Sequence, residues 1–195
     1  MSKTIKMIVV LTVIAGLSGA ILASWDNITK PKIEYHKLLA LKAAISEVIP
    51  TYDHYDELKI DGNTLYLGKV EGQSEPVGIA FKIEGSGFQG SVSIMVGMEP
   101  DFKKITGIKV LEQIETPGLG TKIVEDPSNK SDRYWFPEQF RGVVIEPEIV
   151  ALKNQQPINP NEIQAISGAT ITSKAVVRIL NKNISIVKEL YQSVN

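Results

Sequence analysis

A long uncharged apolar run opens the sequence. It extends over 19 residues, from Met7 to Trp25, without an ionisable side chain. At about 1.5 Å per residue, a helix of this length spans about 28 Å, which is close to the hydrocarbon thickness of a bilayer. The run therefore predicts a transmembrane helix, with Trp25 at the membrane–water interface.

Charges beside this run predict its orientation. Lys3 and Lys6 precede it, and Asp26 follows it directly. Because positively charged flanks stay in the cytoplasm, we expect a single-pass protein of the cell (inner) membrane. Residues 1–26 would be a cytoplasmic stub and an anchor in contact with membrane lipid, and residues 27–195 one extracytoplasmic domain. A cleaved signal peptide is the alternative, but this run is longer than a usual signal core.

Helical spacing returns after the anchor. The apolar side chains that recur every three or four positions in residues 34–49 are Leu38, Leu41, Ile45 and Val48. The pattern predicts an amphipathic helix just outside the membrane. Pro31 separates this helix from the anchor and Pro50 ends it, because proline disrupts a helix interior.

Strand-like segments follow. They are residues 64–70, 77–83, 91–96 and 105–111. The tripeptide Asp61-Gly62-Asn63 is a hairpin-turn signal before the first of them, and further turns are expected at residues 84–87 and 99–101. Strands in succession without intervening helices are typical of a mainly antiparallel sheet. The predicted fold class is therefore α+β, with helices flanking the sheet.

The second half of the chain begins with a long polar stretch, residues 112–140, which is rich in glycine and proline. A loop of this length in a small domain is usually functional. Its aromatic cluster consists of Tyr134, Trp135, Phe136 and Phe140. We interpret the cluster as core rather than as a ligand bed, because aromatic side chains are more often core. Short strands are expected at residues 142–145 and 149–152.

Composition narrows the chemistry. The 195 residues carry a formal net charge of −1, no cysteine and two histidines, His36 and His54. Near-neutral charge argues against a nucleic-acid partner. The lack of cysteine excludes iron–sulfur clusters and thiol catalysis by this chain, and the two histidines show no ligand pattern, so we expect no metal site. Catalytic work would have to use carboxylates, hydroxyls, backbone dipoles or a cofactor. Redox work would require a cofactor that brings its own chemistry.

A hydroxyl-rich turn, Ser167 to Ser173, precedes a final helix that the apolar periodicity predicts from Ser173 onward. A helix N-terminus behind a glycine suits a phosphate. The same residues also make an ordinary helix cap through Thr172 or Ser173, and on physical grounds alone the cap is the better interpretation. The turn is not a P-loop, and no Gly-x-Gly-x-x-Gly turn occurs, so we expect no direct NAD binding.

Two motifs resemble those of the covalent-FMN subunit family. Ser167-Gly168-Ala169-Thr170 resembles the family's flavinylation motif, and Glu115-Thr116-Pro117-Gly118-Leu119-Gly120 resembles its loop near the flavin. The family includes the G subunit of the Rnf electron-transport complex and the C subunit of the Na⁺-translocating NADH:quinone reductase. The resemblance implies FMN joined through a phosphoester to Thr170. The other implied cofactor-binding residues are Ser167, Gly168, Ala169, Thr172, Ser173 and the six residues from Glu115 to Gly120.

One position departs from the family pattern. An acidic residue usually stands six positions before the modified threonine, where this chain has Gln164, with Glu162 two residues earlier. In the family, that acidic residue is linked to recognition by the flavin transferase, which attaches FMN from FAD.

The resemblance implies an electron-transfer subunit of a membrane Rnf-type ion-translocating ferredoxin:NAD⁺ oxidoreductase. Such a subunit assembles with other membrane and peripheral subunits and is matured by the flavin transferase. The chain length favours the Rnf G subunit over the generally longer C subunit of the quinone reductase, which is one alternative. A membrane-anchored binding domain without a cofactor is the other.

Two residues of the loop have specific expected roles. Leu119 would pack on the flavin ring, and the loop glycines would let backbone N–H groups approach it. Glu115 beside the ring would disfavour the anionic reduced flavin by charge repulsion. Its structural alternative is to cap a turn or to pair with Lys122.

Overall fold

The computed structural model describes residues 2–194. The chain divides into two compact units, Met1–Ala40 and Leu41–Asn195. The first unit consists of most of helix α1 (Lys3–Val48). An 18-residue window of α1 has a mean hydropathy of 2.3, and none of it is buried within the protein. The helix is therefore long and apolar enough to cross a membrane.

Helix α1 does not stop at Pro31. Two helices separated by this proline were predicted, and that prediction was wrong, because α1 continues from Lys3 to Val48 with Pro31 inside it. Proline removes a single backbone N–H donor, so the disruption is local. Residues on both sides of it keep helical geometry, and the Thr29 hydroxyl donates to Trp25 O at 2.7 Å within the preceding turn.

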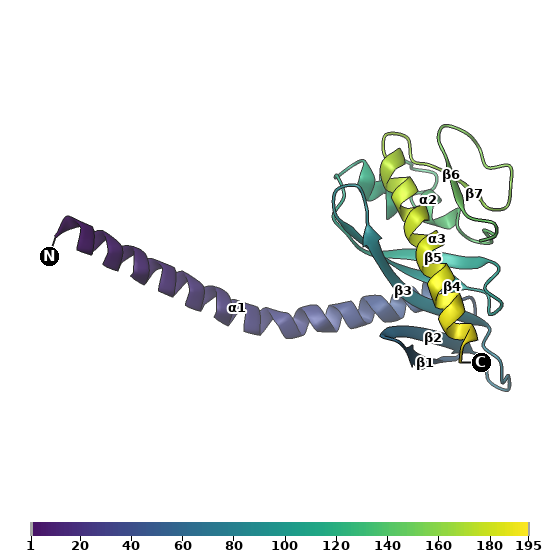
Figure 1. The fold of residues 1–195 in the computed structure, drawn as a ribbon, viewed down its shortest axis with the longest axis horizontal. Coiled ribbons are helices and arrows are strands. Elements are labelled where there is room, and N and C mark those ends of the chain that lie inside the picture. Colours follow the sequence, from purple (N-terminus) through teal and green to yellow (C-terminus); the bar gives the residue numbers. More distant parts are fainter. Residues whose placement is uncertain (1, 195) are drawn as a thin grey trace. The chain divides into compact units, whose positions relative to one another are not determined.

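The second unit is built on a five-stranded antiparallel sheet whose strands are neighbours in chain order (Figure 1). The strands are β1 (His54–Ile60), β2 (Asn63–Lys69), β3 (Gly78–Ser86), β4 (Ser91–Met98) and β5 (Ile105–Gln113). The α+β class and the four strands expected from the sequence are confirmed. The hairpin turn before β2 is confirmed as well, since Ile60 pairs with Asn63 across it.

Two details of the sheet differ from the prediction. Strand β1 was missed because it lies at the sheet edge and is mostly polar and exposed, so it carries little apolar alternation. The turn expected at residues 84–87 was also misplaced, because β3 runs on to Ser86, which pairs with Ser91. The reversal occurs at residues 87–90 instead, where Gly87 N donates to Gly90 O at 2.8 Å.

The two faces of the sheet carry separate cores. Side chains alternate along each strand, so Phe81 and Ile94 face one side and Met95 the other. The first side packs against α3 (Thr170–Gln192), the short helix α2 (Trp135–Glu138) and the loops between them. The second packs against the end of α1 through Ile45 and Val48. The sheet therefore lies between α3 on one face and the last turns of α1 on the other.

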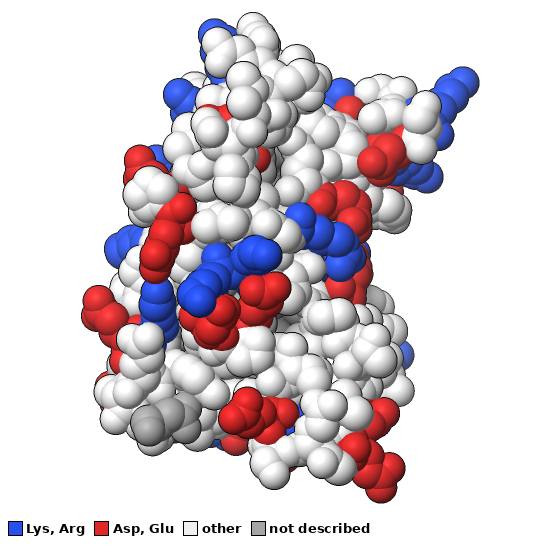
Figure 2. Space-filling view, turned by 90° about the vertical axis from the view of Figure 1, so that its right-hand side faces the viewer, with Lys and Arg blue, Asp and Glu red and all other residues white. Residues whose placement is uncertain are grey.

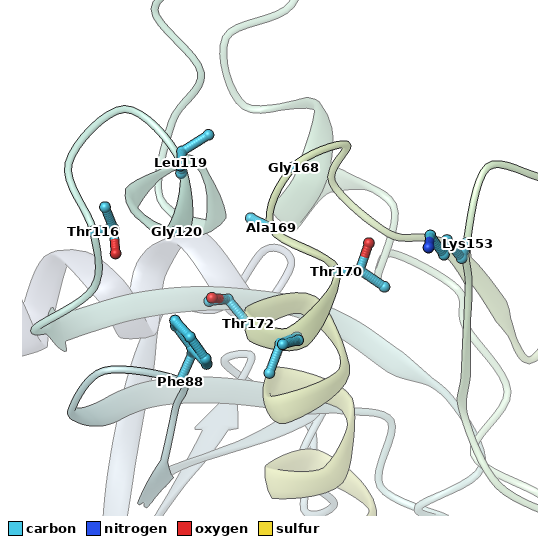
Figure 3. A pocket seen from close by; sticks show the side chains of 10 residues that line it. Phe88, Thr116, Leu119, Gly120, Lys153, Gly168, Ala169, Thr170 and Thr172 are labelled. Carbon is cyan, nitrogen blue, oxygen red and sulfur yellow. The ribbon is translucent and has the colours of Figure 1, made fainter.

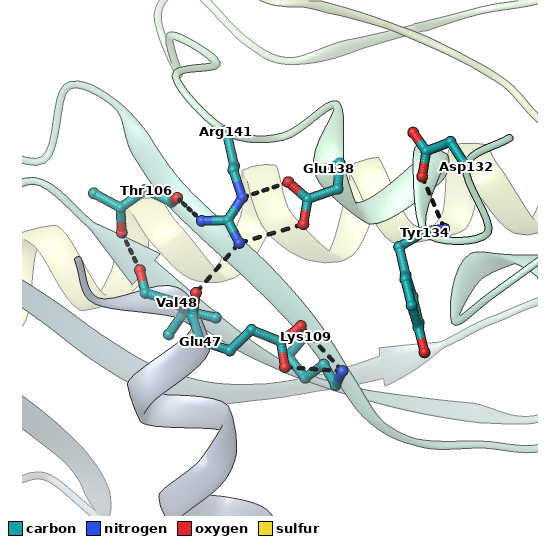
Figure 4. A network of polar contacts seen from close by, with 8 residues as sticks. All are labelled: Glu47, Val48, Thr106, Lys109, Asp132, Tyr134, Glu138 and Arg141. Carbon is teal, nitrogen blue, oxygen red and sulfur yellow. Dashed lines mark hydrogen bonds and ion pairs between the residues drawn. The ribbon is translucent and has the colours of Figure 1, made fainter. Parts of the chain in front are cut away.

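A polar network holds the last turn of α1 to the sheet (Figure 4). Thr106 Oγ1 donates to Val48 O at 2.5 Å, and Arg141 Nη2 donates to Glu47 O at 3.4 Å. These bonds satisfy carbonyls that a helix end leaves without partners. Lys109 Nζ adds an ion pair to the Glu47 carboxylate at 2.9 Å. Side chains from β5 and from the segment after α2 thus cap α1.

The close approach of α1 to β4 yields a prediction at Gly97. A Cβ at this position would overlap Val48 O, so we expect Gly97→Ala to lower the free energy of unfolding by about 3 kcal/mol. Gly107 pairs with Gly97 across β4 and β5, and a Cβ there would meet its nearest atom at an ordinary 3.4 Å. Gly107→Ala is the matched control, and denaturant unfolding of the full chain measures both. Equal losses in the two variants would contradict this assignment.

The segment after β5 contains only short elements before α3. They are the 3₁₀ turn η1 (Gly120–Ile123), α2, and the parallel pair β6 (Val150–Leu152) and β7 (Glu162–Gln164). The predicted strand at 149–152 is confirmed as β6. Residues 142–145 form only an isolated bridge, Val144 with Lys104, so the strand predicted there was wrong. Strand β7 was missed because three residues carry no readable period.

Charges of both signs are interspersed on the molecular surface. Figure 2 shows Lys and Arg next to Asp and Glu on the face that it presents. Several of these charges are paired, as in the ion pair between Lys188 and Glu146 at 2.9 Å. This mixture agrees with the near-neutral net charge of −1.

Candidate functional site

A pocket of about 400 Å³ lies at the N-terminus of α3 (Figure 3). Four separate segments line it: the turn after β3, the loop after β5, the residue after β6, and the start of α3. The lining residues are Phe88, Thr116, Leu119, Gly120, Lys153, Gly168, Ala169, Thr170, Ile171 and Thr172. The volume lies within the range typical of small-molecule and cofactor sites. The two motifs singled out in the sequence therefore meet in one cavity.

Helix α3 begins at Thr170, earlier than predicted, and Ala169 occupies the N-cap position without a capping side chain. The N-cap assigned to Thr172 or Ser173 was therefore wrong. Within residues 2–194, the backbone N–H groups of Thr170, Ile171 and Thr172 have no hydrogen-bond partner, and neither does the Thr170 hydroxyl. Unpartnered N–H groups and the helix dipole favour an anion at this position.

The turn before α3 depends on Gly168. Its φ of +83° lies in the left-handed region, which side chains with a Cβ rarely adopt. A Cβ there would also lie 3.3 Å from Leu119 Cδ2, so the turn packs closely under the loop after β5. Ser167 precedes this turn and lines a different hollow, beside Gln164 and Trp135, rather than the pocket that contains Thr170.

The other two hydroxyls of the motif are engaged in internal hydrogen bonds. Ser173 is fully buried; its Oγ donates to Ala169 O at 3.1 Å and accepts from Ile166 N at 3.0 Å. Thr172 Oγ1 donates to Glu115 Oε2 at 2.8 Å. Ser173 therefore shapes the turn and does not line the pocket, whereas Thr172 lines the pocket while its hydroxyl is bound to Glu115. Thr170 is left as the free hydroxyl of the helix start.

Glu115 is a buried carboxylate, 5% exposed, that joins three segments. Besides the bond from Thr172, its Oε1 accepts from Phe88 N at 2.7 Å and from Gln89 N at 3.1 Å. A Cβ on Gly120 would lie 2.8 Å from Glu115 Oε2, so the loop can close only with glycine there. The turn-capping role considered for Glu115 is confirmed, and it does not line the pocket.

Lys122 does not pair with Glu115 and instead bonds to Asp126 Oδ2 at 3.1 Å. The Asp126 carboxylate also accepts from the Ser128 hydroxyl at 2.5 Å. The Ser128 hydrogen bond, followed by the Lys122 ammonium, lowers the pKa of Asp126 from 3.8 to about 2. The pairing suggested between Glu115 and Lys122 was therefore wrong, because Lys122 pairs with Asp126, four residues further along the chain.

The lowered pKa of Asp126 predicts an acid-sensitive stability. A carboxyl whose folded-state pKa is depressed contributes stability above its unfolded pKa, and this contribution is lost as pH falls toward the folded value. Between pH 4 and pH 2, the unfolding temperature of the wild-type chain should fall more steeply than that of Asp126→Asn. A pH series of thermal unfolding curves measures this. Parallel curves for the two proteins over this interval would exclude the contribution.

The loop from Thr116 to Gly120 is only partly as expected. Thr116, Leu119 and Gly120 line the pocket, whereas Pro117 and Gly118 are exposed and do not. The N–H groups of Gly118 and Leu119 bond within the loop, to Thr121 Oγ1 at 2.9 Å and to Thr116 O at 3.2 Å. These two N–H groups are therefore used by the tight turn itself, and the prediction that the loop supplies backbone N–H groups to a ligand stays a prediction for its remaining residues.

The apolar lining includes residues that sequence reasoning did not assign to the site. Phe88 and Ile171 are 60% and 61% exposed, and Leu119 is 46% exposed. Large side chains this exposed on a pocket wall form an apolar bed for a flat ligand. Lys153 supplies the cation of the pocket and was also missed. In the sequence, the one signal for these pocket residues was a large apolar residue, Phe88, in a glycine-containing turn. Lys153 gave no such signal.

The aromatic cluster of the long loop is mainly core, as interpreted. Phe136 and Phe140 are fully buried, and their rings lie 5.5 Å apart edge to face. Trp135 packs against the same core. Tyr134 is exposed, with Lys109 Nζ 5.6 Å from its ring centroid. None of the four lines the pocket that contains Thr170. Within residues 2–194, no group of three His, Cys, Asp or Glu is placed to hold a metal ion.

Residues 87–185 match the FMN-binding domain family. The chain is 30% identical to the G subunit of the ion-translocating oxidoreductase complex of Methanosarcina acetivorans, over 93% of each chain. It is 32% identical to the G subunit of the Na⁺-translocating ferredoxin:NAD⁺ oxidoreductase complex of Acetobacterium woodii, over 95% of this chain and 92% of that one. The chain therefore belongs to the FMN-binding domain family and, within it, to the G subunits of ion-translocating oxidoreductase complexes.

A solved structure shares the fold. The C subunit of the Na⁺-translocating NADH-quinone reductase from Parabacteroides distasonis superposes with a TM-score of 0.53 at 27% identity, covering 66% of this chain and 62% of that one. The family resemblance inferred from the two motifs is confirmed. The matched range contains all of the pocket lining.

The pocket fits FMN on its own geometry. One end offers an apolar bed for a ring system, and the other offers unpartnered N–H groups and a free hydroxyl for a phosphate. These two features line the same pocket, within the part of the chain that matches the FMN-binding domain family.

Proposed function

We propose that this chain is the electron-transfer subunit of a membrane Rnf-type ion-translocating ferredoxin:NAD⁺ oxidoreductase, with FMN attached through a phosphoester to Thr170. The observation that carries the proposal is the start of α3, where Thr170 presents an unbonded hydroxyl beside unpartnered N–H groups inside a pocket. Relatives that are named as G subunits and cover nearly all of the chain support it.

Attachment is a substitution at phosphorus performed by a flavin transferase. The Thr170 oxygen forms a bond to the phosphorus of the FMN half of FAD, the pyrophosphate bond breaks, AMP leaves, and the hydroxyl proton passes to solvent. The N–H groups and the dipole at the N-terminus of α3 would hold the phosphodiester and stabilise its charge. The chain thereby keeps the cofactor from diffusing away.

The remaining lining residues orient the cofactor. Phe88, Leu119 and Ile171 give the ring an apolar bed, and Glu115 holds the turn bearing Phe88 against the first turn of α3. When bound, FMN supplies the electron transfer itself, while the protein sets its orientation and potential. The chain needs no catalytic side chain of its own for this role.

Mass spectrometry tests the proposal directly. The full chain is produced with and without a competent flavin transferase, digested, and searched for the peptide containing Thr170. A mass increase equal to FMN minus water, present only with the transferase, is the expected result. An unmodified peptide and a colourless protein after co-production would refute attachment and favour the cofactor-free binding domain.

The membrane topology is part of the proposal. Residues 1–26 form the cytoplasmic stub and the anchor, and residues 27–195 the extracytoplasmic domain. The chain contains no cysteine, so single-cysteine variants report sidedness cleanly. Ser74→Cys, on an exposed turn of the sheet domain, should react with an impermeant maleimide in intact cells, whereas Ser2→Cys should react only after permeabilisation. The reverse pattern would invert the topology.

The C subunit of a Na⁺-translocating NADH:quinone reductase is the second candidate, which the fold likeness to that protein favours. Both candidates use the same flavin site, so the cofactor does not separate them. Co-purification of the tagged chain with its complex does. An iron–sulfur subunit that oxidises ferredoxin would support the Rnf assignment, and an NADH-oxidising flavoprotein of the quinone reductase would support the alternative.

A further inference from the structure

The pocket is polarised along its length. Phe88, Thr116 and Leu119 lie on one side of Thr170, and Lys153 lies on the opposite side (Figure 3). FMN has the same polarity, because its apolar ring and its phosphate are at opposite ends of the ribityl chain. With phosphorus joined to the Thr170 oxygen, the ring can reach its apolar bed only if it extends away from Lys153.

The backbone of Lys153 is held in place relative to α3. The side chain of Asn181 on α3 forms two hydrogen bonds with the backbone of Ile149. Ile149 N donates to Asn181 Oδ1 at 3.0 Å, and Asn181 Nδ2 donates to Ile149 O at 2.9 Å. At the other end of β6, Ala165 N donates to Leu152 O at 2.8 Å. Lys153 follows directly, so strand β6 places it beside the helix start rather than on a free loop.

The Lys153 ammonium has no counter-ion within the described part of the chain. Lys153 is exposed, and no carboxylate or hydrogen-bond acceptor there contacts it. The nearest acid along β7, Glu162, is used by the loop itself, where its Oε2 accepts from Ile158 N at 2.9 Å and from Asn159 N at 3.0 Å. A cation on a pocket wall without a partner attracts an anionic group into that pocket.

We propose that Lys153 is the counter-ion of the FMN phosphodiester and positions the cofactor, an inference that rests on the function proposed above. Lys153 holds the phosphate oxygens from one side while the N–H groups at the start of α3 hold them from the other. With the phosphate held between the Lys153 ammonium and these N–H groups, the ribityl chain would extend toward Leu119 and Phe88. Lys153 acts on orientation and attachment and does not touch the ring.

Three variants of the full chain test this role. Lys153→Met removes the charge and keeps most of the side-chain length, and Lys153→Arg keeps the charge. Lys174→Met is the matched control, because Lys174 is exposed, lies one turn beyond Thr170 on α3, and does not line the pocket. Each is produced with and without the flavin transferase, in the same detergent.

Three measurements distinguish a phosphate contact from a general structural role. The first is the rate of flavinylation, which should fall about tenfold in Lys153→Met and change little in Lys153→Arg and Lys174→Met. The second is the difference in unfolding temperature between flavinylated and unmodified protein at low and high salt. Its salt-sensitive part should be equally large in the wild type and in Lys174→Met and clearly smaller in Lys153→Met, because salt screens an exposed ion pair. The ³¹P resonance of the phosphodiester should shift only in Lys153→Met.

The outcomes separate this inference from the function beneath it. If Lys153→Met matches Lys174→Met in rate, salt sensitivity and ³¹P resonance while both carry FMN on Thr170, Lys153 is not the counter-ion and the proposed function stands. If Lys153→Met cannot be flavinylated but Lys153→Arg can, the inference is supported. If the wild-type chain carries no adduct on Thr170, the proposed function falls and this inference falls with it.

Discussion

Thr170→Ala should leave the chain without covalent flavin. The hydroxyl of Thr170 is the unbonded one at the start of α3, and the neighbouring hydroxyls of Thr172 and Ser173 are committed to Glu115 and Ala169. No other side chain in the pocket presents a free hydroxyl at the helix N-terminus, among the residues that the structure describes. In-gel flavin fluorescence after denaturation and the mass of the Thr170 peptide measure the loss, which should reach background.

Two control variants accompany this prediction. Thr170→Ser keeps the hydroxyl and should retain a detectable adduct. Ser167→Ala removes a hydroxyl of the same motif that lies outside the pocket, and it should be flavinylated like the wild type. Fluorescence that persists in denatured Thr170→Ala would place the attachment on another residue and overturn the assignment of this site.

Glu115→Ala should be the most destabilising substitution at the site. It leaves the Thr172 hydroxyl without its acceptor in a buried position, and Phe88 N and Gln89 N without theirs in a partly buried one. Unmet buried donors cost about 1–3 kcal/mol each before water enters, so we expect a net loss of about 3 kcal/mol. Denaturant unfolding of the unmodified full chain measures this without any contribution from FMN. Flavinylation should fall as well, since the turn bearing Phe88 loosens.

Milder changes at the same contact give a graded series. Glu115→Gln keeps an oxygen for the two N–H groups, and its amide can donate to Thr172 Oγ1, so its cost should be about 1 kcal/mol. Thr172→Val removes a single hydrogen bond and should cost a similar amount. If Glu115→Gln is as unstable as Glu115→Ala, the negative charge rather than the hydrogen-bond geometry holds these segments together.

The sheet shows how far local patterns reach. Strands β2 to β5 were predicted because apolar residues face a core and alternate with polar ones or form short apolar runs. Strand β1 was missed because it lies at an edge, where pairing with β2 through backbone hydrogen bonds needs no apolar side chains. The end of β3 was misassigned because Glu84 and Gly85 suggest a turn, yet pairing with β4 extends the strand.

Helix ends were decided by contacts distant in sequence. Thr172 is a good N-cap by propensity. In the structure its hydroxyl bonds to Glu115, 57 residues away along the chain, and the helix begins at Thr170, three residues before the predicted start at Ser173. At Pro31 the local rule predicted a break, and the helix continued because a single lost N–H does not end it.

The sequence by itself determined the apolar N-terminal helix and the α+β class, and it singled out the hydroxyl of Thr170 as a candidate attachment point. Each of these depends on residues that are adjacent or periodic in the chain. The tertiary structure alone decided that Glu115 is buried and joins separate segments through hydrogen bonds, and that Phe88, Lys153 and Ile171 line one pocket with Thr170. These residues come from four segments, and what brings them together is the pairing of strands and the packing of α3 on the sheet. The residue pattern within any single segment does not predict that these four segments lie close together.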